Sequence, residues 1–192
     1  PEGAATNDGA YLTMPRDDLL RLLALEGARH RALLIGEDLG TLPEGFREVL
    51  ETHDVQGLRV LYFERAADQG FIGPMHWNRQ AVAMTSTHDI PTIAGWWTEH
   101  DLDLRDSLGL VRDLQAERAA RAVDRERLWS AMKASGAAAG QTPPRDAPEP
   151  VVDAAVAHTA LSACDLMLLP MEDAIGTVEQ PNLPGTHDQH PN

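Results

Sequence analysis

Acidic residues follow apolar runs at several places in this sequence, and they are the side chains best placed to do chemistry. The run from Leu33 to Ile35 leads through a glycine to Glu37 and Asp38, and a second run over 81–84 leads to His88 and Asp89. A packed strand rarely ends on bare carboxylates without a chemical reason. Because reactive groups in β/α barrels follow the carboxyl ends of the strands, this pattern predicts the mouth of a barrel enzyme.

Two more apolar runs end on acids, at Glu64 and at Glu172 or Asp173. On a barrel, all of these carboxylates would lie on the carboxyl face. An acid-rich rim suits glycoside chemistry, in which one carboxylic acid protonates the leaving oxygen and a retaining enzyme uses a second carboxylate about 5 Å away as nucleophile. The acid must keep its proton near neutral pH, so its pKa has to be raised by burial or by a neighbouring negative charge.

Each candidate also has a structural interpretation. Asp38 is equally a turn or cap residue before the helix expected at residue 43. Asp89 precedes Ile90 and Pro91, a typical N-cap position. His88 lies in no HExxH or His-x-His pattern, which favours a hydrogen bond to substrate over a metal ligand, with simple packing as the alternative. The adjacent Trp96 and Trp97 could stack on a sugar ring, but at least one of them is expected to pack in the core.

The surrounding pattern predicts alternating helices and strands. Because parallel strands need crossover connections, this order indicates a parallel α/β fold. Gly/Ala/Pro-rich residues 136–150 are expected to form a connector. The expected helices cover 17–29, 43–53, a start at 92–97, 114–133 and 151–163, and the expected strands cover 32–36, 58–64, 81–85 and the run beginning at 166.

Composition excludes several classes of partner. With 30 acidic and 16 basic residues among 192, the net charge of −14 repels nucleic acid and anionic membrane surfaces but not a neutral sugar. The single cysteine, Cys164, cannot form an intramolecular disulfide and suits a reducing cytoplasm, where we expect the protein to be. No apolar run approaches the roughly 20 residues of a membrane span. The chain begins with Pro1 rather than Met, so it is expected to be part of a longer protein.

Several strings of the sequence resemble one known family, in its order and approximate spacing. The strings are GAYLTMP at 9–15, IGEDLG at 35–40, THDIPT at 87–92, LPMED within 168–173 and EQPNLPGT at 179–186. They are similar to the 4-α-glucanotransferases of the amylomaltase, or disproportionating enzyme, family. The resemblance covers nearly the whole chain and is weakest over 99–160. It implies a retaining transglycosylase on a TIM (β/α)8 barrel that acts on malto-oligosaccharides or α-1,4-glucans without a cofactor or metal.

The resemblance also implies roles for individual residues. Glu37 would be the general acid/base, and Asp89 would stabilise the oxocarbenium-like transition state and hold sugar hydroxyls. The substrate-binding residues would be His88, Asp38, Glu64 and Asn182.

One element of the family pattern does not occur in these 192 residues. The family's nucleophilic aspartate lies in an Arg-Ile-Asp-His type motif upstream of the Gly-Ala-Tyr string, and Asp8, Asp17 and Asp18 lack that context. Residues 1–192 are therefore expected to form the C-terminal part of a catalytic barrel, approximately strands five to eight. Two other hypotheses stay open. The chain could be a truncated, non-catalytic fragment that at most binds glucan, or part of an α-glucan hydrolase of the same clan.

Overall fold

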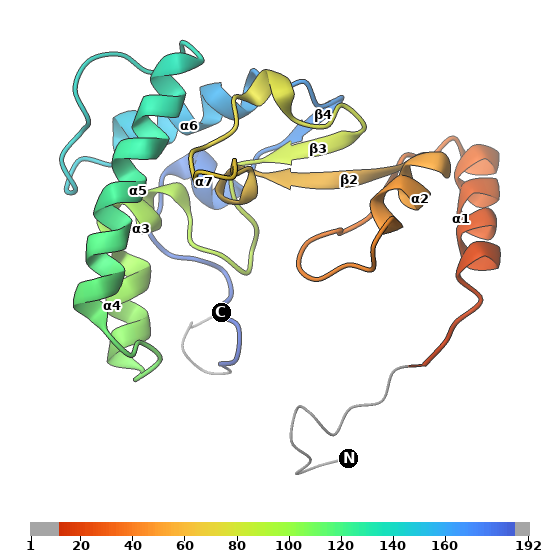
Figure 1. The fold of residues 1–192 in the computed structure, drawn as a ribbon, viewed down its shortest axis with the longest axis horizontal. Coiled ribbons are helices and arrows are strands. Elements are labelled where there is room, and N and C mark those ends of the chain that lie inside the picture. Colours follow the sequence, from red (N-terminus) through yellow and green to blue (C-terminus); the bar gives the residue numbers. More distant parts are fainter. Residues whose placement is uncertain (1–11, 187–192) are drawn as a thin grey trace.

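A parallel four-stranded sheet lies at the centre of the computed structural model, which describes residues 12–186 (Figure 1). Its strands, in spatial order, are β1 (Leu34–Ile35), β2 (Val55–Val60), β3 (Ala81–Met84) and β4 (Leu166–Leu168). All three pairs of neighbouring strands are parallel, which confirms the predicted α/β class. Val60 pairs with Met84 and Met84 with Leu168, so the carboxyl ends of β2, β3 and β4 lie level with one another. Asp8 and residues 9–11 of the first motif lie outside the described residues.

Five α-helices lie close to where the sequence predicted them, whereas the helices over 100–107 and 171–175 were not among those expected. Helix α1 has Asp17 and Asp18 in its first turn and Arg29 in its last, as the helix dipole favours. Helix α5 begins at a capping residue, Asp113, whose side chain accepts a hydrogen bond from the amide of Ala116 at 2.9 Å. The seven helices of the described residues are α1 (Arg16–His30), α2 (Phe46–Thr52), α3 (Ile93–Thr98), α4 (His100–Ser107), α5 (Leu114–Ala134), α6 (Glu149–Ala160) and α7 (Met171–Ile175).

The second strand begins earlier than the sequence predicted. The expected strand covered 58–64, whereas β2 begins at Val55 and gives way to a 3-10 turn, η2 (Leu61–Phe63). Gly57, directly before the expected strand, lies within β2. A Cβ atom at this position would lie 2.9 Å from a carboxylate oxygen of Asp38. The glycine therefore makes room for a buried acid, and it does not break the strand.

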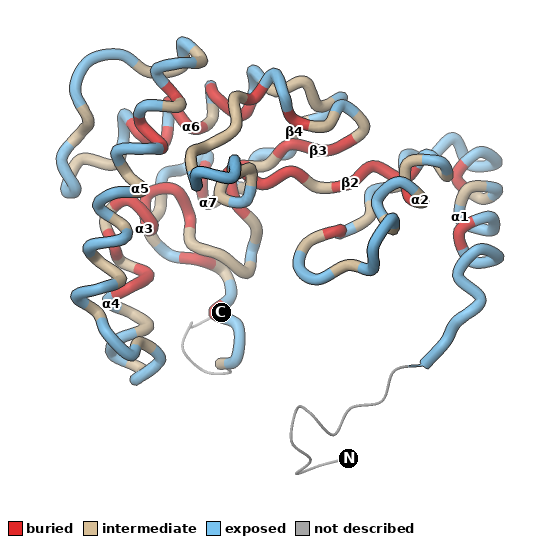
Figure 2. The backbone as a smooth tube through the Cα atoms, in the orientation of Figure 1, coloured by how far each residue is buried: buried red, intermediate tan, exposed pale blue. Residues whose placement is uncertain are grey.

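The main hydrophobic core lies between the sheet and helices α3, α5 and α6 (Figure 2). Trp96 and Trp97 are both buried within it, which confirms the prediction that at least one of them packs. Trp77 and Trp129 belong to the same cluster. This part of the chain can therefore hold the ends of β2 and β3 rigidly. Its fully buried large side chains include Trp97, Leu61, Ile93, Leu128, Met132 and Val151.

Apolar side chains at the other end of the sheet are much more exposed. Among residues 12–186, a small buried cluster of Leu20, Leu50 and Val55 lies there, and most of α1 faces solvent in Figure 2. Ile35 on β1 and Leu168 on β4 are 45% and 47% exposed. These two edge-strand side chains are therefore only partly covered within the described residues, whereas Val60 and Val82 on the central strands are fully buried. Exposed leucines on α1 are Leu19, Leu22, Leu23 and Leu25.

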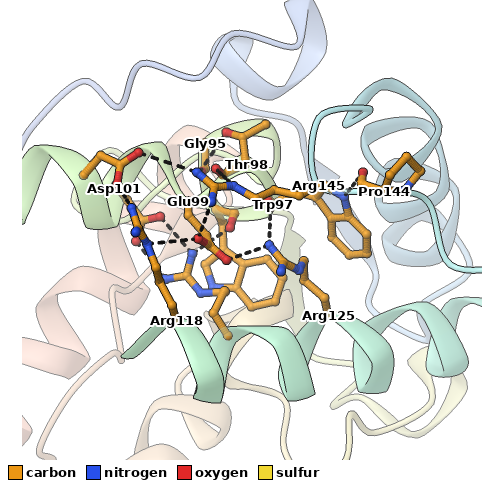
Figure 3. A network of polar contacts seen from close by, with 12 residues as sticks. Gly95, Trp97, Thr98, Glu99, Asp101, Arg118, Arg125, Pro144 and Arg145 are labelled. Atoms are coloured by element: carbon orange, nitrogen blue, oxygen red, sulfur yellow. Dashed lines mark hydrogen bonds and ion pairs between the residues drawn. The ribbon is translucent and has the colours of Figure 1, made fainter. Parts of the chain in front are cut away.

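A network of ion pairs joins α3, α4 and α5 to the connector that precedes α6 (Figure 3). Glu99, at the α3–α4 junction, is 3% exposed and pairs with Arg125 at 2.8 Å, Arg145 at 2.9 Å and Arg118 at 3.3 Å. The carbonyl of Pro144 accepts a hydrogen bond from the indole of Trp97 at 3.1 Å. The predicted connector is therefore fixed to the core at Pro144 and Arg145.

None of the helices within residues 12–186 is both long and apolar enough to cross a bilayer.

Candidate active site

Glu37 and His88 line the same trough at the carboxyl ends of the strands. Glu37 follows β1 by two residues, and His88 lies in the turn that follows β3. The trough measures about 530 Å³, and Glu172 and Thr87 contribute polar atoms to its wall. Its remaining wall is mainly apolar and includes Ile35, Leu58, Met84, Leu168, Leu169, Pro170 and Pro181. The fold thus brings together side chains that are 51 residues apart in the sequence.

Three of the predicted site residues contact one another beside this trough. The carboxylate of Asp89 lies 3.3 Å from Nε2 of His88 and accepts a hydrogen bond from the side-chain amide of Asn182 at 2.5 Å. The backbone amide of Asn182 also donates to the carbonyl of His88 at 3.0 Å. His88 is 65% exposed and Asp89 43% exposed, so both are open to a ligand.

Asp89 faces a second cavity, of about 390 Å³, on the other side of the turn. Tyr62, Phe63 and Trp96 give this cavity aromatic walls, and Gln180 adds an amide. The sequence analysis did not single out Tyr62 or Phe63, which lie in η2 after β2. Two adjacent residues, His88 and Asp89, therefore line two different cavities. A chain-like ligand that passes the turn can contact both.

The alternative interpretation of Asp89 as a helix cap is wrong. Thr92 is the N-cap of α3, and its hydroxyl accepts a hydrogen bond from the amide of Gly95 at 3.0 Å. Asp89 lies three residues before this cap, in the turn itself. Its carboxylate contacts the side chains of His88 and Asn182 and does not cap α3.

Asp38 points away from the trough that Glu37 lines. It is 1% exposed and accepts hydrogen bonds from the amide of Leu58 at 2.6 Å, from Arg47 at 2.9 Å and from Arg59 at 3.0 Å. Burial raises the pKa of Asp38, but the Leu58 amide and the two guanidinium groups outweigh it and bring the pKa below its usual value. Asp38 does not cap α2, whose N-cap is Gly45. These three donors already engage the carboxylate. A contact between Asp38 and substrate stays a prediction.

Glu64 lies in a third cavity, of about 460 Å³, rather than in the trough. Arg47, Arg59 and Arg65 line this cavity with it. Burial raises the pKa of Glu64, although the charges of Arg59 and Arg47 partly oppose this effect. The structure therefore places Glu64 apart from Glu37 and His88, and its substrate contact stays a prediction.

Glu172 and Asp173, both on α7, differ clearly in their surroundings. Glu172 lines the trough, whereas Asp173 is fully buried and accepts hydrogen bonds from Thr85, Ser86 and the amide of Ile93. The sequence analysis missed this arrangement. The signal was the adjacent pair Thr85 and Ser86, directly after the apolar run 81–84. Hydroxyl groups buried at the end of a strand need hydrogen-bond partners, which an acid can supply.

Within residues 12–186, no cluster of three or more His, Cys, Asp or Glu side chains has a geometry that could hold a metal ion. The described site presents carboxylates, a histidine and an amide. Parallel strands whose carboxyl ends present such groups beside a trough define an α/β enzyme-type domain with the layout of part of a β/α barrel. The model of the 4-alpha-glucanotransferase family matches residues 1–192, and the chain belongs to that family.

Curated relatives of the chain are named 4-alpha-glucanotransferase. The chain is 32% identical over 197 residues to 4-alpha-glucanotransferases of Mycobacterium bovis and Mycobacterium tuberculosis, with all of this chain and 27% of theirs aligned. It is 38% identical over 111 residues to the Haemophilus influenzae 4-alpha-glucanotransferase, over 58% of this chain and 16% of the relative. The chain thus spans about a quarter of the length of the mycobacterial proteins.

Solved structures of amylomaltases have the same fold. The amylomaltase of Corynebacterium glutamicum superimposes with a TM-score of 0.89 at 25% identity. The superposition covers all of this chain and 29% of the amylomaltase chain. The Streptococcus agalactiae amylomaltase, in complex with acarbose, gives a TM-score of 0.63 at 16% identity over 95% of this chain and 31% of its own. The open parallel sheet is therefore similar to part of an amylomaltase, a TIM-barrel enzyme.

Proposed function

We propose that this chain supplies the acid/base side of the active site of a retaining 4-α-glucanotransferase, as strands five to eight of the barrel. The observation that carries the proposal is the meeting of Glu37 and His88 at one trough, with the Asp89–Asn182 contact beside it. Family membership supports it, because the matching model covers every residue of the chain. The reaction moves α-1,4-glucan segments from one malto-oligosaccharide to another.

Glu37 is the proton donor and acceptor in this proposal. In the first step, Glu37 protonates the glycosidic oxygen while a nucleophilic carboxylate attacks the anomeric carbon, which forms a glucosyl-enzyme ester and releases the shortened glucan. In the second step, Glu37 removes the proton from the 4-hydroxyl of an acceptor sugar, which attacks the anomeric carbon and frees the carboxylate. The exposed position of Glu37 on the trough leaves room for the sugar on which it acts.

Asp89 stabilises positive charge at the anomeric centre in both steps, because a carboxylate close to an oxocarbenium-like ion favours it electrostatically. His88 and Asn182 hydrogen-bond sugar hydroxyls from either side of Asp89. Asp38 and Glu64 belong to the wider substrate-binding set. No cofactor or metal is needed for this chemistry.

The nucleophile is assigned to a residue outside this sequence, because no Arg-Ile-Asp-His string occurs within the 192 residues. An oligosaccharide ligand is supported by the Streptococcus agalactiae neighbour, which is in complex with acarbose. The net charge of −14 favours such a neutral ligand over nucleic acid or an anionic membrane. Cytoplasmic location remains a proposal that rests on the single cysteine.

A second candidate applies to the chain on its own. Ile35 on β1 and Leu168 on β4, the two edge strands, keep exposed apolar side chains on one face of the sheet. Residues 1–192 alone would then be a non-catalytic part that binds glucan weakly or associates with other chains through this face and the free strand edges. A third candidate, an α-glucan hydrolase of the same clan, differs in using water as the acceptor.

The test is incubation of the complete gene product with maltotriose. Transfer releases glucose and produces longer maltodextrins without increasing the number of reducing ends, whereas hydrolysis increases that number. Replacing the acid in Glu37→Gln is expected to lower the rate by about 10²- to 10⁴-fold, the usual contribution of a general acid/base. Glu48→Gln, at an exposed position on α2, is the matched control and should keep full activity.

Two results would count against the proposal. One is maltotriose left unchanged by the complete gene product. The other is a Glu37→Gln variant as active as the parent protein. Size-exclusion chromatography of residues 1–192 decides the second candidate, because a sharp monomer with transferase activity is incompatible with a non-catalytic part.

A further inference from the structure

Asp173 is a fully buried carboxylate whose three hydrogen-bond donors all come from one distant segment. Its Oδ2 accepts hydrogen bonds from the hydroxyls of Thr85 at 2.5 Å and Ser86 at 2.6 Å, and its Oδ1 accepts one from the amide of Ile93 at 2.7 Å. Asp173 lies on α7, 80 to 88 residues further along the chain. Hydrogen bonds to a charged acceptor are about twice as strong as neutral ones, so this contact fixes both partners firmly.

These donors lie at the two ends of the turn that carries His88 and Asp89. Thr85 and Ser86 directly follow β3, and Ile93 is the first residue of α3. Asp173 therefore joins the end of the strand to the start of the helix. Its position decides how far apart the two ends of the turn lie.

The turn between those ends has little internal support. Its hydrogen bonds from Ile90 to the carbonyl of Thr87 and from the Asp89 amide to the Thr87 hydroxyl are both 3.4 Å long. Bonds of that length are weak compared with the usual 2.9–3.0 Å. The turn is thus held from outside, through its two ends and through Asn182.

The segment after α7 adds two further contacts to the same region. The hydroxyl of Thr92 donates to the carbonyl of Thr177 at 2.7 Å. Gly95 allows the backbone at Val178 to approach α3 closely, since a Cβ atom on Gly95 would lie 2.4 Å from the Val178 carbonyl oxygen. This packing leads the chain on to Asn182, which contacts Asp89. One segment, residues 173–182, therefore fixes the turn at both of its ends and at Asp89.

We propose that Asp173 is a positioning residue for Asp89, acting through Thr85, Ser86 and Ile93. This inference rests on the proposed function, in which Asp89 stabilises the transition state. Asp173 itself touches no substrate, because it is fully buried. A stabilising carboxylate must keep its place to within about 0.5 Å, so loosening the turn lowers the rate without removing any group from the active site.

Kinetics of the complete gene product carrying Asp173→Asn tests this role. Asparagine keeps the size of the side chain and one acceptor oxygen but cannot accept from all three donors in the same way. The expected result is a kcat at least about tenfold lower with a KM for maltotriose within about threefold, because a contact made in the transition state affects kcat. The matched control is Asp165→Asn, which removes an exposed carboxylate that pairs with Arg79 and should leave both constants unchanged.

Two further variants keep the test decisive if Asp173→Asn fails to fold. Thr85→Val and Ser86→Ala each remove one donor, and each should lower kcat by more than about threefold in protein that melts within a few degrees of the parent. A kcat within twofold of the parent in the folded variants would overturn the proposal. A loss that merely follows the unfolded fraction, and that cooling restores, would overturn it as well.

A crystal structure of a folded variant separates this inference from the proposed function. If the parent protein has no transferase activity, or Glu37→Gln keeps it, the proposed function fails whatever Asp173 does. The positioning role is then decided by geometry alone. It requires the Asp89 carboxylate to move away from the Asn182 amide in Asp173→Asn, and an Asp89 that stays in hydrogen-bond contact refutes it.

Discussion

Glu99 is a buried carboxylate whose loss should weaken the α3–α5 region, and Glu99→Gln tests this. It forms ion pairs with three arginines, but these differ in burial. The side chain of Arg125 is 15% exposed, while those of Arg118 and Arg145 are 39% and 45% exposed. In the glutamine variant, Arg125 keeps its charge in a buried place without a carboxylate, whereas the other two arginines can turn to water or to Asp103.

The expected cost follows from this difference in burial. A charge-assisted hydrogen bond to a buried group contributes about 1.5–3 kcal/mol. Each exposed ion pair contributes about 0.5 kcal/mol. We therefore expect Glu99→Gln to destabilise the region by about 3 kcal/mol, in the range measured for broken buried ion pairs. At 1.4 kcal/mol for each factor of ten, amide hydrogens of α3, α4 and α5 should exchange about 100-fold faster.

Hydrogen exchange followed by mass spectrometry measures this effect for these helices separately from the rest of the protein. Asp103→Asn is the matched control, since Asp103 pairs with two of the same arginines but is 49% exposed. It should cost less than about 1 kcal/mol, or less than about a fivefold change in exchange. Equal effects of the two substitutions would refute the argument that burial decides the contribution.

Three further predictions concern stability. Gly95→Ala should destabilise the protein by about 2–3 kcal/mol in thermal unfolding, because the new Cβ would lie 2.4 Å from the Val178 carbonyl oxygen; an unchanged melting temperature would contradict this close approach. Although burial alone would raise the pKa of Asp38, its hydrogen-bond donors hold the pKa below the usual value, so its contribution is present above about pH 4 and lost on acidification. In urea denaturation, Asp38→Asn should lower the free energy of unfolding by about 3 kcal/mol at pH 7 and by less at acidic pH. Burial lowers the pKa of His158 from 6.5 to about 4, so the folded protein binds fewer protons than the unfolded chain between these pH values. Stability should fall by up to about 1.4 kcal/mol per pH unit as the pH drops from 6.5 to 4, and His158→Asn should remove that slope.

Helix and strand order could be predicted from the sequence because apolar periodicity records which faces are buried. The start of β2 could not. Gly57 lies within β2, and the space that a side chain there would occupy is taken by Asp38, 19 residues earlier. No local pattern contains that information.

The candidate site was predictable to a similar degree. Acids after apolar runs predicted one acidic rim of Glu37, Glu64, Asp89 and Glu172 or Asp173, and of these only Glu37 and Glu172 line the same trough in the described residues. The pattern could not tell which acids turn inward. Asp38 and Asp173 are buried by partners that lie 9 to 88 residues away, whereas their neighbours Glu37 and Glu172 line the trough.

The fixed connector before α6 has a practical consequence for proteolysis. Arg145 donates to the carbonyl of Thr98 at 2.8 Å and pairs with Glu99, so its side chain is engaged while the network is closed. Trypsin must extend several residues around an arginine before it can cut the following peptide bond. The rate of tryptic cleavage after Arg145 thus records how often the connector detaches from α3, with no label introduced into the protein.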